Sequence, residues 1–353
     1  MLITGAGSGV GLEAARRFAR EGARLALLGR SEATLRQVIE AHGIADAVAI
    51  AADVTDRGRV EAAVAEAVDV MGGLDVVVSN AGAAVFGHVL EVHPDDFDRA
   101  VAITFTGAVN VIRAALPHLR RSRGTVVATG SLNARVPLSA WSAYASAKHA
   151  LRGFLNTLAV EEREQRSGVR VTIVHPGPID TPLFAQASSA TGIQPRVAPE
   201  SYTAGIVAQA LVEVAIRPRT EVILGGETRL LDFAFRFARP VGETAMLAID
   251  RWFRSGDRIA DAPGSLWVAP RNPQSSGGIP ARDSLLAPLQ LGRRMLPAPS
   301  TPLRFLRHVA IAATRLPRIG GALLRPATEQ PPPAAGLAGV SRERPQRAGT
   351  VTV

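Results

Sequence analysis

The chain of 353 residues is 47% hydrophobic, enough for one large domain or about two smaller ones. It has no cysteine, which excludes disulfides and thiolate zinc sites, and its seven histidines lack a metal-binding spacing, so we expect no metal. The net charge of +9 would suit nucleic acid, but residues 270–353 carry all of it, with twelve arginines against three acidic residues. We therefore expect no nucleic-acid partner.

Membrane and export signals are weak. No apolar run approaches the ~20 residues of a spanning helix, and the first residues lack the order of a signal peptide, so we expect a soluble, cytoplasmic protein. The first apolar run begins at Met1 and is short for a central strand. Either the start site is assigned too late, or the first strand is frayed at its beginning.

Seven short apolar runs alternate with longer stretches of helical periodicity, which is typical of βαβ units. The runs cover residues 1–4, 24–28, 47–52, 74–78, 124–129, 169–174 and 220–224. Their continuous hydrophobicity indicates strands covered on both faces. Residues 1–226 are therefore predicted to form one α/β domain, a doubly wound, parallel, seven-stranded sheet of the Rossmann type.

Two amphipathic stretches, 228–238 and 241–254, follow the last strand and are separated by Pro240. They predict a C-terminal helical extension over residues 227–268, with a core that we expect to include Phe233, Phe237, Trp252 and Phe253.

Residues 269–353 hold 13 of the 24 prolines and are predicted to be largely disordered. Within them, 302–325 has the pattern of a basic amphipathic helix. Two interpretations stay open: a transient helix, or a peripheral contact with a membrane surface.

A glycine-rich turn follows the first strand and opens a helix. Its sequence, Thr4-Gly-Ala-Gly-Ser-Gly-Val-Gly11, lets the backbone approach a pyrophosphate while the helix N-terminus directs N–H groups at it. The turn, at the end of a strand, predicts a nucleotide site.

The spacing T-G-x-x-x-G-x-G resembles that of short-chain dehydrogenases/reductases, and further motifs of that family occur at later strand ends. They are Asp53-Val54, Ser79-Asn80-Ala81-Gly82 and Pro176-Gly177-Pro178-Ile179-Asp180-Thr181. The resemblance covers residues 1 to about 225 and implies an NAD(P)-dependent oxidoreductase acting on CH–OH groups. The cofactor contacts it implies are Gly5, Ser8, Gly9, Val10, Gly11, Asp53, Val54, Asn80, Ala81, Gly82, Tyr144, Lys148, Pro176, Gly177, Ile179 and Thr181.

The second strand ends in Leu28-Gly29-Arg30-Ser31, where members of the family that prefer NAD carry an acid. Without a carboxylate to repel a 2′-phosphate, and with a guanidinium to bind one, Arg30 and Ser31 favour NADP(H) over NAD. The alternative is that Arg30 is a solvated loop charge.

Lys148 is the only lysine in the chain and stands four residues after Tyr144, on the same face of a predicted helix. Ser131 precedes Tyr144 by thirteen residues, the usual spacing in this family. The resemblance implies that Tyr144 exchanges the proton, Ser131 hydrogen-bonds the developing oxyanion, and Lys148 binds the nicotinamide ribose and lowers the pKa of Tyr144.

Thr104 stands where the family carries a catalytic asparagine that orients a water in its proton relay. Threonine would hold that water differently, so slow turnover or another proton path is expected. An uncharacterised bacterial subgroup with threonine here and a similar helical extension is the part of the family that this chain resembles most.

Three functions can be compared. The intact Ser131, Tyr144 and Lys148 favour an NADP(H)-dependent enzyme that interconverts a carbonyl and a secondary alcohol. Thr104 and the basic tail keep open a catalytically weak, NADP-binding regulator or scaffold. A serine hydrolase using Ser131 is disfavoured because the chain lacks a G-x-S-x-G elbow.

The expected substrate pocket is formed by 83–88, 132–141 and 182–199, which are mostly apolar and favour an apolar ketone or alcohol. Members of the family associate through helices equivalent to 104–119 and 144–161, so we expect a homodimer or homotetramer.

Overall fold

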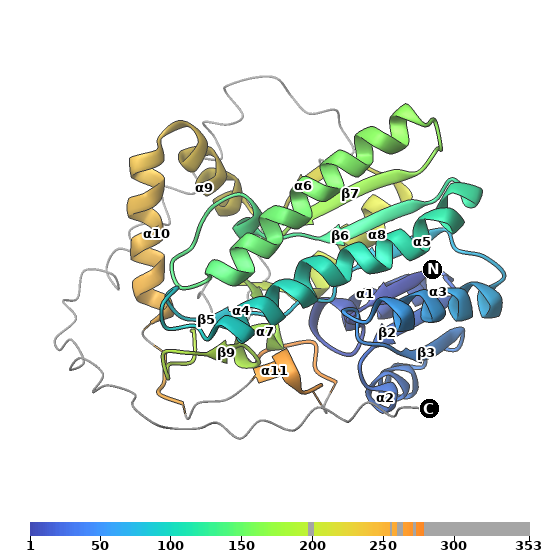
Figure 1. Cartoon of the computed structure of the whole chain (residues 1–353), viewed down its shortest axis with the longest axis horizontal. Helices are drawn as coiled ribbons and strands as arrows, with labels where there is room; N and C mark the ends of the chain where they lie inside the picture. Colours follow the sequence, from blue (N-terminus) through green and yellow to red (C-terminus); the bar gives the residue numbers. More distant parts are fainter. Residues whose placement is uncertain (197–200, 255, 260–263, 271–272, 279–353) are drawn as a thin grey trace, which may run out of the picture.

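A computed structural model describes residues 1–196, 201–254, 256–259, 264–270 and 273–278. Seven parallel strands form one sheet in the order β11-β7-β6-β4-β1-β2-β3, which confirms the predicted fold class (Figure 1). The strands are β1 (Leu2–Thr4), β2 (Leu25–Gly29), β3 (Ala47–Ala51), β4 (Val76–Ser79), β6 (Thr125–Thr129), β7 (Arg170–His175) and β11 (Glu221–Ile223). Although it has only three residues, β1 is central, because Leu2 pairs with Ala26 on one side and Val77 on the other.

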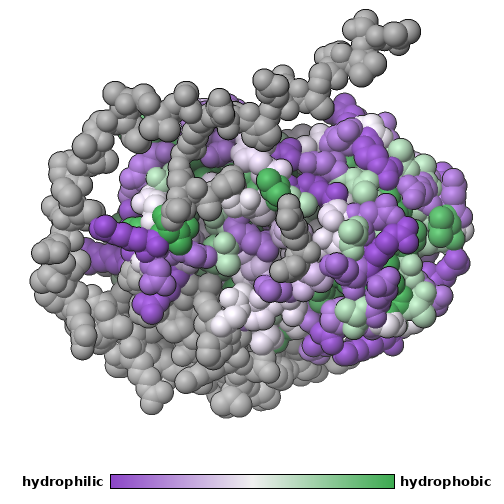
Figure 2. Space-filling model, turned by 90° about the horizontal axis from the view of Figure 1, so that it is seen from below, coloured by the Kyte–Doolittle hydropathy of each residue, from purple (hydrophilic) through white to green (hydrophobic). Residues whose placement is uncertain are grey.

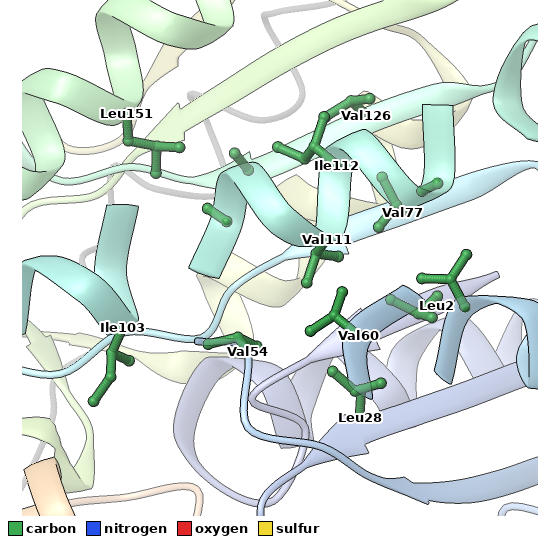
Figure 3. Packing of buried hydrophobic residues seen from close by; sticks show 14 of the residues in the cluster. Leu2, Leu28, Val54, Val60, Val77, Ile103, Val111, Ile112, Val126 and Leu151 are labelled. Carbon is green, nitrogen blue, oxygen red and sulfur yellow. The ribbon is translucent and has the colours of Figure 1, made fainter. Parts of the chain in front are cut away.

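Helices cover both faces of the sheet. They are α1 (Gly9–Arg20), α2 (Glu32–His42), α3 (Arg57–Met71), α4 (Pro94–Val101), α5 (Gly107–Ser122), α6 (Ser142–Glu164) and α8 (Ala204–Ile216). Because successive strand residues face opposite sides, the sheet feeds two cores. Leu2, Leu28, Val77 and Val126 pack with α3, α5 and α6 (Figure 3), whereas Ile3, Leu27, Val78 and Val127 pack with α1 and α8.

The continuous helical run Pro94–Ser122 is long and apolar enough to cross a membrane by composition, with a mean hydropathy of 1.4 in its most apolar window. Half of that window is buried within the fold, where α5 packs on α3. A core helix of a globular domain meets the same criterion, so the run carries little weight as a membrane signal.

The C-terminal extension contains α9 (Gly226–Phe237), α10 (Arg239–Phe253) and α11 (Gly264–Trp267). The two predicted helices are present, with Pro240 inside the first turn of α10. The prediction that Phe233 and Phe237 are core residues was wrong, because their side chains are 39% and 69% exposed. Their rings instead pack on each other, with centroids 4.7 Å apart. The side chains of Trp252 and Phe253 lie outside the described residues.

Several short elements lie at the carboxyl edge of the sheet, beyond the C-terminal ends of its parallel strands. They are β5 (Val85–Phe86), β8 (Ile179–Asp180), β9 (Ser188–Ser189), β10 (Tyr202–Thr203), α7 (Pro182–Ala185) and the 3-10 helix η2 (Leu132–Ala134). Residues 269, 270 and 273–278 of the predicted disordered region lie against the fold, whereas 302–325 lies outside the described residues.

Candidate active site

The predicted site residues gather at the carboxyl edge of the sheet, where ligands of open α/β folds bind. The glycine turn Gly5, Ser8, Gly9, Val10 and Gly11 follows β1, Arg30 and Ser31 follow β2, Asp53 and Val54 follow β3, Asn80, Ala81 and Gly82 follow β4, Ser131 follows β6, and Pro176, Gly177, Ile179 and Thr181 follow β7. Tyr144 and Lys148 lie in the first two turns of α6, one turn apart.

The side chains of Ser131 and Tyr144 lie beside each other, close enough for the serine hydroxyl to lower the pKa of the phenol. Ser131 caps the N-terminus of η2, where its Oγ accepts from the amide of Asn133 at 3.1 Å. This bond fixes the serine side chain and leaves its one proton for another partner. A carbonyl oxygen placed beside the tyrosine phenol would therefore meet a second, preset hydroxyl.

Lys148 is buried, and its Nζ donates to the main-chain carbonyl of Thr129 at 2.7 Å. The ammonium lies 5.6 Å from the centroid of the Tyr144 ring. Burial disfavours the charged form and lowers the pKa of Lys148 to about 8. The sequence did not indicate Thr129 as the anchor of the lysine.

The pKa of Tyr144 differs from the sequence expectation. Burial raises it to about 12, and the neighbouring Ser131 hydroxyl only partly opposes that rise. The expected lowering by Lys148 is not found: the lysine directs a donor at Thr129, and its ammonium lies 5.6 Å from the centroid of the half-buried Tyr144 ring. At neutral pH the phenol therefore holds its proton and can donate it.

His175 lies behind Ser131 and is fully buried. Its Nδ1 is 3.0 Å from the carbonyl oxygen of Ser131, and its Nε2 is 3.9 Å from Glu221. Burial lowers the pKa of His175 to about 4 despite the nearby carboxylate, so the ring is neutral at pH 7. Its Nδ1 lies within hydrogen-bonding distance of both the carbonyl oxygen and the amide of Ser131. His175 directly precedes the Pro176–Thr181 motif in the sequence, which gave no signal of this contact.

A cluster of charges extends from His175 to the C-terminal helices. Glu221 accepts from Arg135, and also from Arg152 at 2.7 Å. Arg135 also forms a two-point pair with Asp232 of α9, at 2.7 and 2.9 Å. Burial opposes ionisation of Glu221, but the bonds from Arg152 and Asn156 outweigh it and hold its pKa at about 2. Through Arg135, these ion pairs connect the end of η2, just after Ser131, to α9.

Thr104 occupies a single π-helical turn, η1 (Ala102–Thr106), between α4 and α5. Its hydroxyl is fully buried, donates to the carbonyl of Ala83 at 3.0 Å and accepts from the amide of Ala83 at 3.1 Å. The single hydroxyl proton is therefore used within the protein. A water held by this side chain could be bound only through the remaining acceptor lone pair.

The glycine turn is packed closely against β4. Gly5 has a φ of +64°, and a Cβ on Gly11 would lie 2.1 Å from the carbonyl oxygen of Gly5. Asn80 fastens the turn, since its Nδ2 donates to the Thr4 carbonyl at 3.2 Å and its Oδ1 accepts from the Thr129 hydroxyl at 3.0 Å. One asparagine thus connects the turn to the strand that anchors Lys148.

The turn fits a dinucleotide pyrophosphate. Gly9, at a φ of +53°, is the first residue of α1, and the preceding Ser8 makes no side-chain capping bond, so the amides of the helix N-terminus suit an anion. A Cβ on Gly9 would lie 3.4 Å from Thr181, which brings the turn against the segment after β7. A dinucleotide bound here would run between these two segments.

Arg30 and Asp53 lie at the other end of the expected dinucleotide site. This site, from Asp53 past the glycine turn to Thr181, is called the groove below. Arg30 donates to main-chain carbonyls of the C-terminal segment, and Ser31 caps α2 by accepting from Thr34 at 3.2 Å. Asp53 accepts from Thr55 at 2.9 Å and from Arg99. Although burial works against ionisation, these bonds keep the pKa of Asp53 below its ordinary value.

Beside Tyr144 the structure has an apolar wall. Trp141 packs edge-on against Tyr144 and Phe184, with ring centroids 6.2 and 5.5 Å apart. The cluster also includes Ala84, Phe86, Ala140 and Ala187, with Leu138, Leu183 and Ile249 packed against it. On the face seen in Figure 2, hydrophilic side chains predominate and hydrophobic ones occur in small groups among the described residues. The side chains beside the Tyr144 phenol thus form a largely buried apolar wall.

A family profile described as "short chain dehydrogenase" matches residues 1–192. The chain belongs to this family. The dehydrogenase is 33% identical over 239 residues to the uncharacterised oxidoreductase YxnA of Bacillus subtilis, covering 65% of this chain and 66% of YxnA, just under two thirds of that relative. It is 32% identical over 237 residues to dehydrogenase/reductase SDR family member 7B of Bos taurus, covering 64% of this chain and 72% of the relative.

Solved structures agree with the fold. An alcohol dehydrogenase from Thermococcus sibiricus, complexed with 5-hydroxy-NADP, matches with a TM-score of 0.56 and 26% identity over 63% of this chain and 94% of its own. A 3-ketoacyl-(acyl-carrier-protein) reductase from Brucella melitensis, complexed with NADH, matches with a TM-score of 0.56 and 27% identity over the same shares of the two chains. The dehydrogenase is therefore an NAD(P)-dependent oxidoreductase acting on CH–OH groups.

Proposed function

We propose that this dehydrogenase reduces an apolar carbonyl compound to a secondary alcohol with NADPH. The observation that carries the proposal is the placement of the Ser131 hydroxyl beside the Tyr144 phenol, which lies one helical turn from the buried Lys148. Carbonyl reduction needs a proton donor and a second hydrogen bond at the same oxygen, and these two hydroxyls provide both.

Each catalytic side chain has a distinct role in the proposal. Tyr144 donates its phenolic proton to the substrate oxygen, and Ser131 stabilises the charge that develops there. Lys148 gives one donor to Thr129 and directs its others toward the ribose of the dinucleotide and the phenol. NADPH, when bound, supplies the hydride.

NADP(H) is proposed rather than NAD(H) because of Arg30. Arg30 follows β2, and its two Nη atoms donate to three main-chain carbonyl oxygens. The same N–H groups are suited to donate to the oxygens of a 2′-phosphate. The related structures carry both kinds of cofactor, one with 5-hydroxy-NADP and one with NADH, so the preference depends on the residues of this chain.

The protonated phenol supports catalysis in the reducing direction. With a pKa of about 12, Tyr144 is protonated at neutral pH and is ready to act as an acid. Oxidation of an alcohol would need the phenolate, whose population is small until the pH approaches that pKa. Reduction is therefore the proposed direction at neutral pH.

The substrate proposed from the apolar wall is a ketone with an apolar body that packs on Trp141 and Phe184. The cytoplasmic location and the homodimer or homotetramer through α5 and α6 also belong to the proposal. They rest on the residues and on the family alone.

A catalytically weak NADP-binding regulator is the second candidate, and one observation favours it. The only proton of the Thr104 hydroxyl is committed to Ala83, so the side chain cannot donate to a relay water. Screening apolar ketones for NADPH consumption at pH 7 decides between the two functions. Turnover of any ketone above that of a Tyr144→Phe control supports the reductase, whereas cofactor binding with no turnover supports the regulator.

A further inference from the structure

The C-terminal residues 264–270 and 273–278, here called the docked segment, lie along the groove expected to hold the dinucleotide. At one end, Leu266 has no exposed surface and belongs to the same buried cluster as Val54 and Ile103. Beside it the Arg99 guanidinium lies 5.5 Å from the centroid of the Trp267 ring and donates to the carbonyl of Leu266 at 3.2 Å. This is the end of the groove at which Asp53 and Val54 would border an adenine.

The docked segment also takes the donors of Arg30. The guanidinium donates to the carbonyl oxygens of Ser265 at 2.7 Å and of Leu266 and Val268 at 3.1 Å each. Burial lowers the pKa of Arg30, but the guanidinium stays protonated at neutral pH. The three carbonyl oxygens therefore stabilise a positive charge that is partly removed from water. Those are the same donors that a 2′-phosphate would need.

At the helix N-terminus the competition is direct. The amide of Gly9 donates to the carbonyl of Gln274 at 2.7 Å, and the Thr34 hydroxyl donates to the carbonyl of Pro270 at 3.4 Å. A single N–H makes one good hydrogen bond, so the Gly9 amide cannot serve both Gln274 and a phosphate oxygen.

The docked segment reaches the far end of the groove as well. The carboxylate of Asp180 accepts from the Ser276 hydroxyl at 2.6 Å and from the amide of Gly277 at 2.9 Å. A Cβ on Gly277 would lie 2.8 Å from the carbonyl oxygen of Thr181. Thr181 belongs to the segment expected to hold the nicotinamide, so the docked segment follows the groove from the adenine end to the nicotinamide end.

We propose that the docked segment is an intramolecular competitor of the dinucleotide: it occupies the cofactor groove, and NADP(H) must displace it to bind. The proposal rests on the proposed function, because that function places NADP(H) in this groove. A segment that closed over a bound cofactor as a lid would leave the Gly9 amide to the pyrophosphate. Instead, the segment uses the donors of both Gly9 and Arg30.

The first test compares two full-length variants in a fluorescence titration with NADPH. Leu266→Asp places a carboxylate in an apolar site and should undock the segment, whereas Val70→Asp adds the same charge on α3, outside the docked segment, at a residue that is 54% exposed. We expect Leu266→Asp to bind NADPH roughly tenfold more tightly than wild type, because the competitor is removed. Val70→Asp should bind like wild type.

Equal, measurable NADPH affinity in wild type and Leu266→Asp would overturn the competition and leave the proposed function intact. No NADPH binding by either protein would overturn both.

The second measurement uses the wild type alone, so it does not depend on how the variants fold. Hydrogen exchange of the amides in 264–270 should become faster when saturating NADPH is added, because the segment leaves the groove. Slower or unchanged exchange in 264–270 would contradict the proposal, and slower exchange would identify the segment as a lid over the cofactor.

Discussion

Lys148 donates from Nζ to the main-chain carbonyl of Thr129 at 2.7 Å, which ties the second turn of α6 to the last residue of β6. The bond fixes the only ammonium side chain of the protein in a buried site beside Tyr144. Because an ammonium is compact and can donate in three directions, one donor anchors the lysine and the others serve the ligand.

Replacing Lys148 with Arg keeps the charge but substitutes a larger, planar group. We expect kcat/KM for NADPH-dependent reduction to fall by roughly 100-fold or more. The planar guanidinium cannot donate to the Thr129 carbonyl and also contact the ribose and the phenol. Steady-state kinetics measure the effect, and thermal unfolding shows whether the variant is folded. A folded Lys148→Arg variant with wild-type kcat/KM would contradict the assigned role.

Thr104→Val removes a buried hydroxyl while keeping the shape of the side chain. The amide and carbonyl of Ala83 would both lose their partner, so the free energy of unfolding should fall by about 1–3 kcal/mol. Denaturant titration gives this value, with Thr104→Ser as a control that retains both bonds. If Thr104→Val were as stable as Thr104→Ser, the hydrogen bonds between Thr104 and Ala83 would not stabilise the fold.

Arg30→Ala tests cofactor preference. The ratio of NADPH to NADH affinity should fall by roughly tenfold or more, because only NADPH carries the 2′-phosphate. The ratio is the informative quantity, since release of the docked segment would change the affinity for both cofactors alike. Titrations with each cofactor measure it, and an unchanged ratio would show that Arg30 does not select the phosphate.

His175 should make the stability depend on pH between about 6.5 and 4. Its pKa is about 4 in the folded protein and about 6.5 when unfolded, so in this range the unfolded chain takes up a proton that the folded one does not. Stability is therefore full above pH 6.5 and declines as the pH falls toward 4. Glu221, whose pKa is about 4.5 unfolded and about 2 folded, adds its own loss of stability once the pH falls below about 5.

The matching experiment compares denaturant unfolding of His175→Asn and of His149→Asn, a variant of an exposed histidine. The His175→Asn variant should lose much of the decline between pH 6.5 and 4, and His149→Asn should keep it. Parallel curves for His175→Asn and the wild type would show that the buried ring does not govern acid stability.

The parts of the fold and site that follow local rules could be predicted from sequence. The apolar runs located all seven strands, and the glycine turn was expected between a strand and a helix, where it lies. The i, i+4 spacing of Tyr144 and Lys148 was sufficient to place them on one face of α6.

What could not be predicted depends on contacts between distant residues. Thr129 bonds Lys148 through its main chain, so its side chain gives no signal. His175 meets Ser131 across 44 residues of sequence, and its ring stays neutral because of burial, which composition does not reveal.

Two further features illustrate the same limit. From residue 269 on, the docked segment was expected to be disordered because of its prolines. It is held through main-chain groups such as the carbonyl of Gln274, which the side-chain pattern does not reveal. Phe237 has the periodicity of a core residue, but α9 leaves it 69% exposed.

The central claim is that Tyr144 donates the proton in carbonyl reduction. Its most direct test compares Tyr144→Phe with wild type. The NADPH dissociation constant and kcat/KM for a ketone that the wild type reduces are measured on the same preparations. The account predicts NADPH affinity within a few-fold of wild type and a loss of kcat/KM of roughly 100- to 10,000-fold, because the ring remains and only the acid is removed. Wild-type kcat/KM in a Tyr144→Phe variant that still binds NADPH would contradict it.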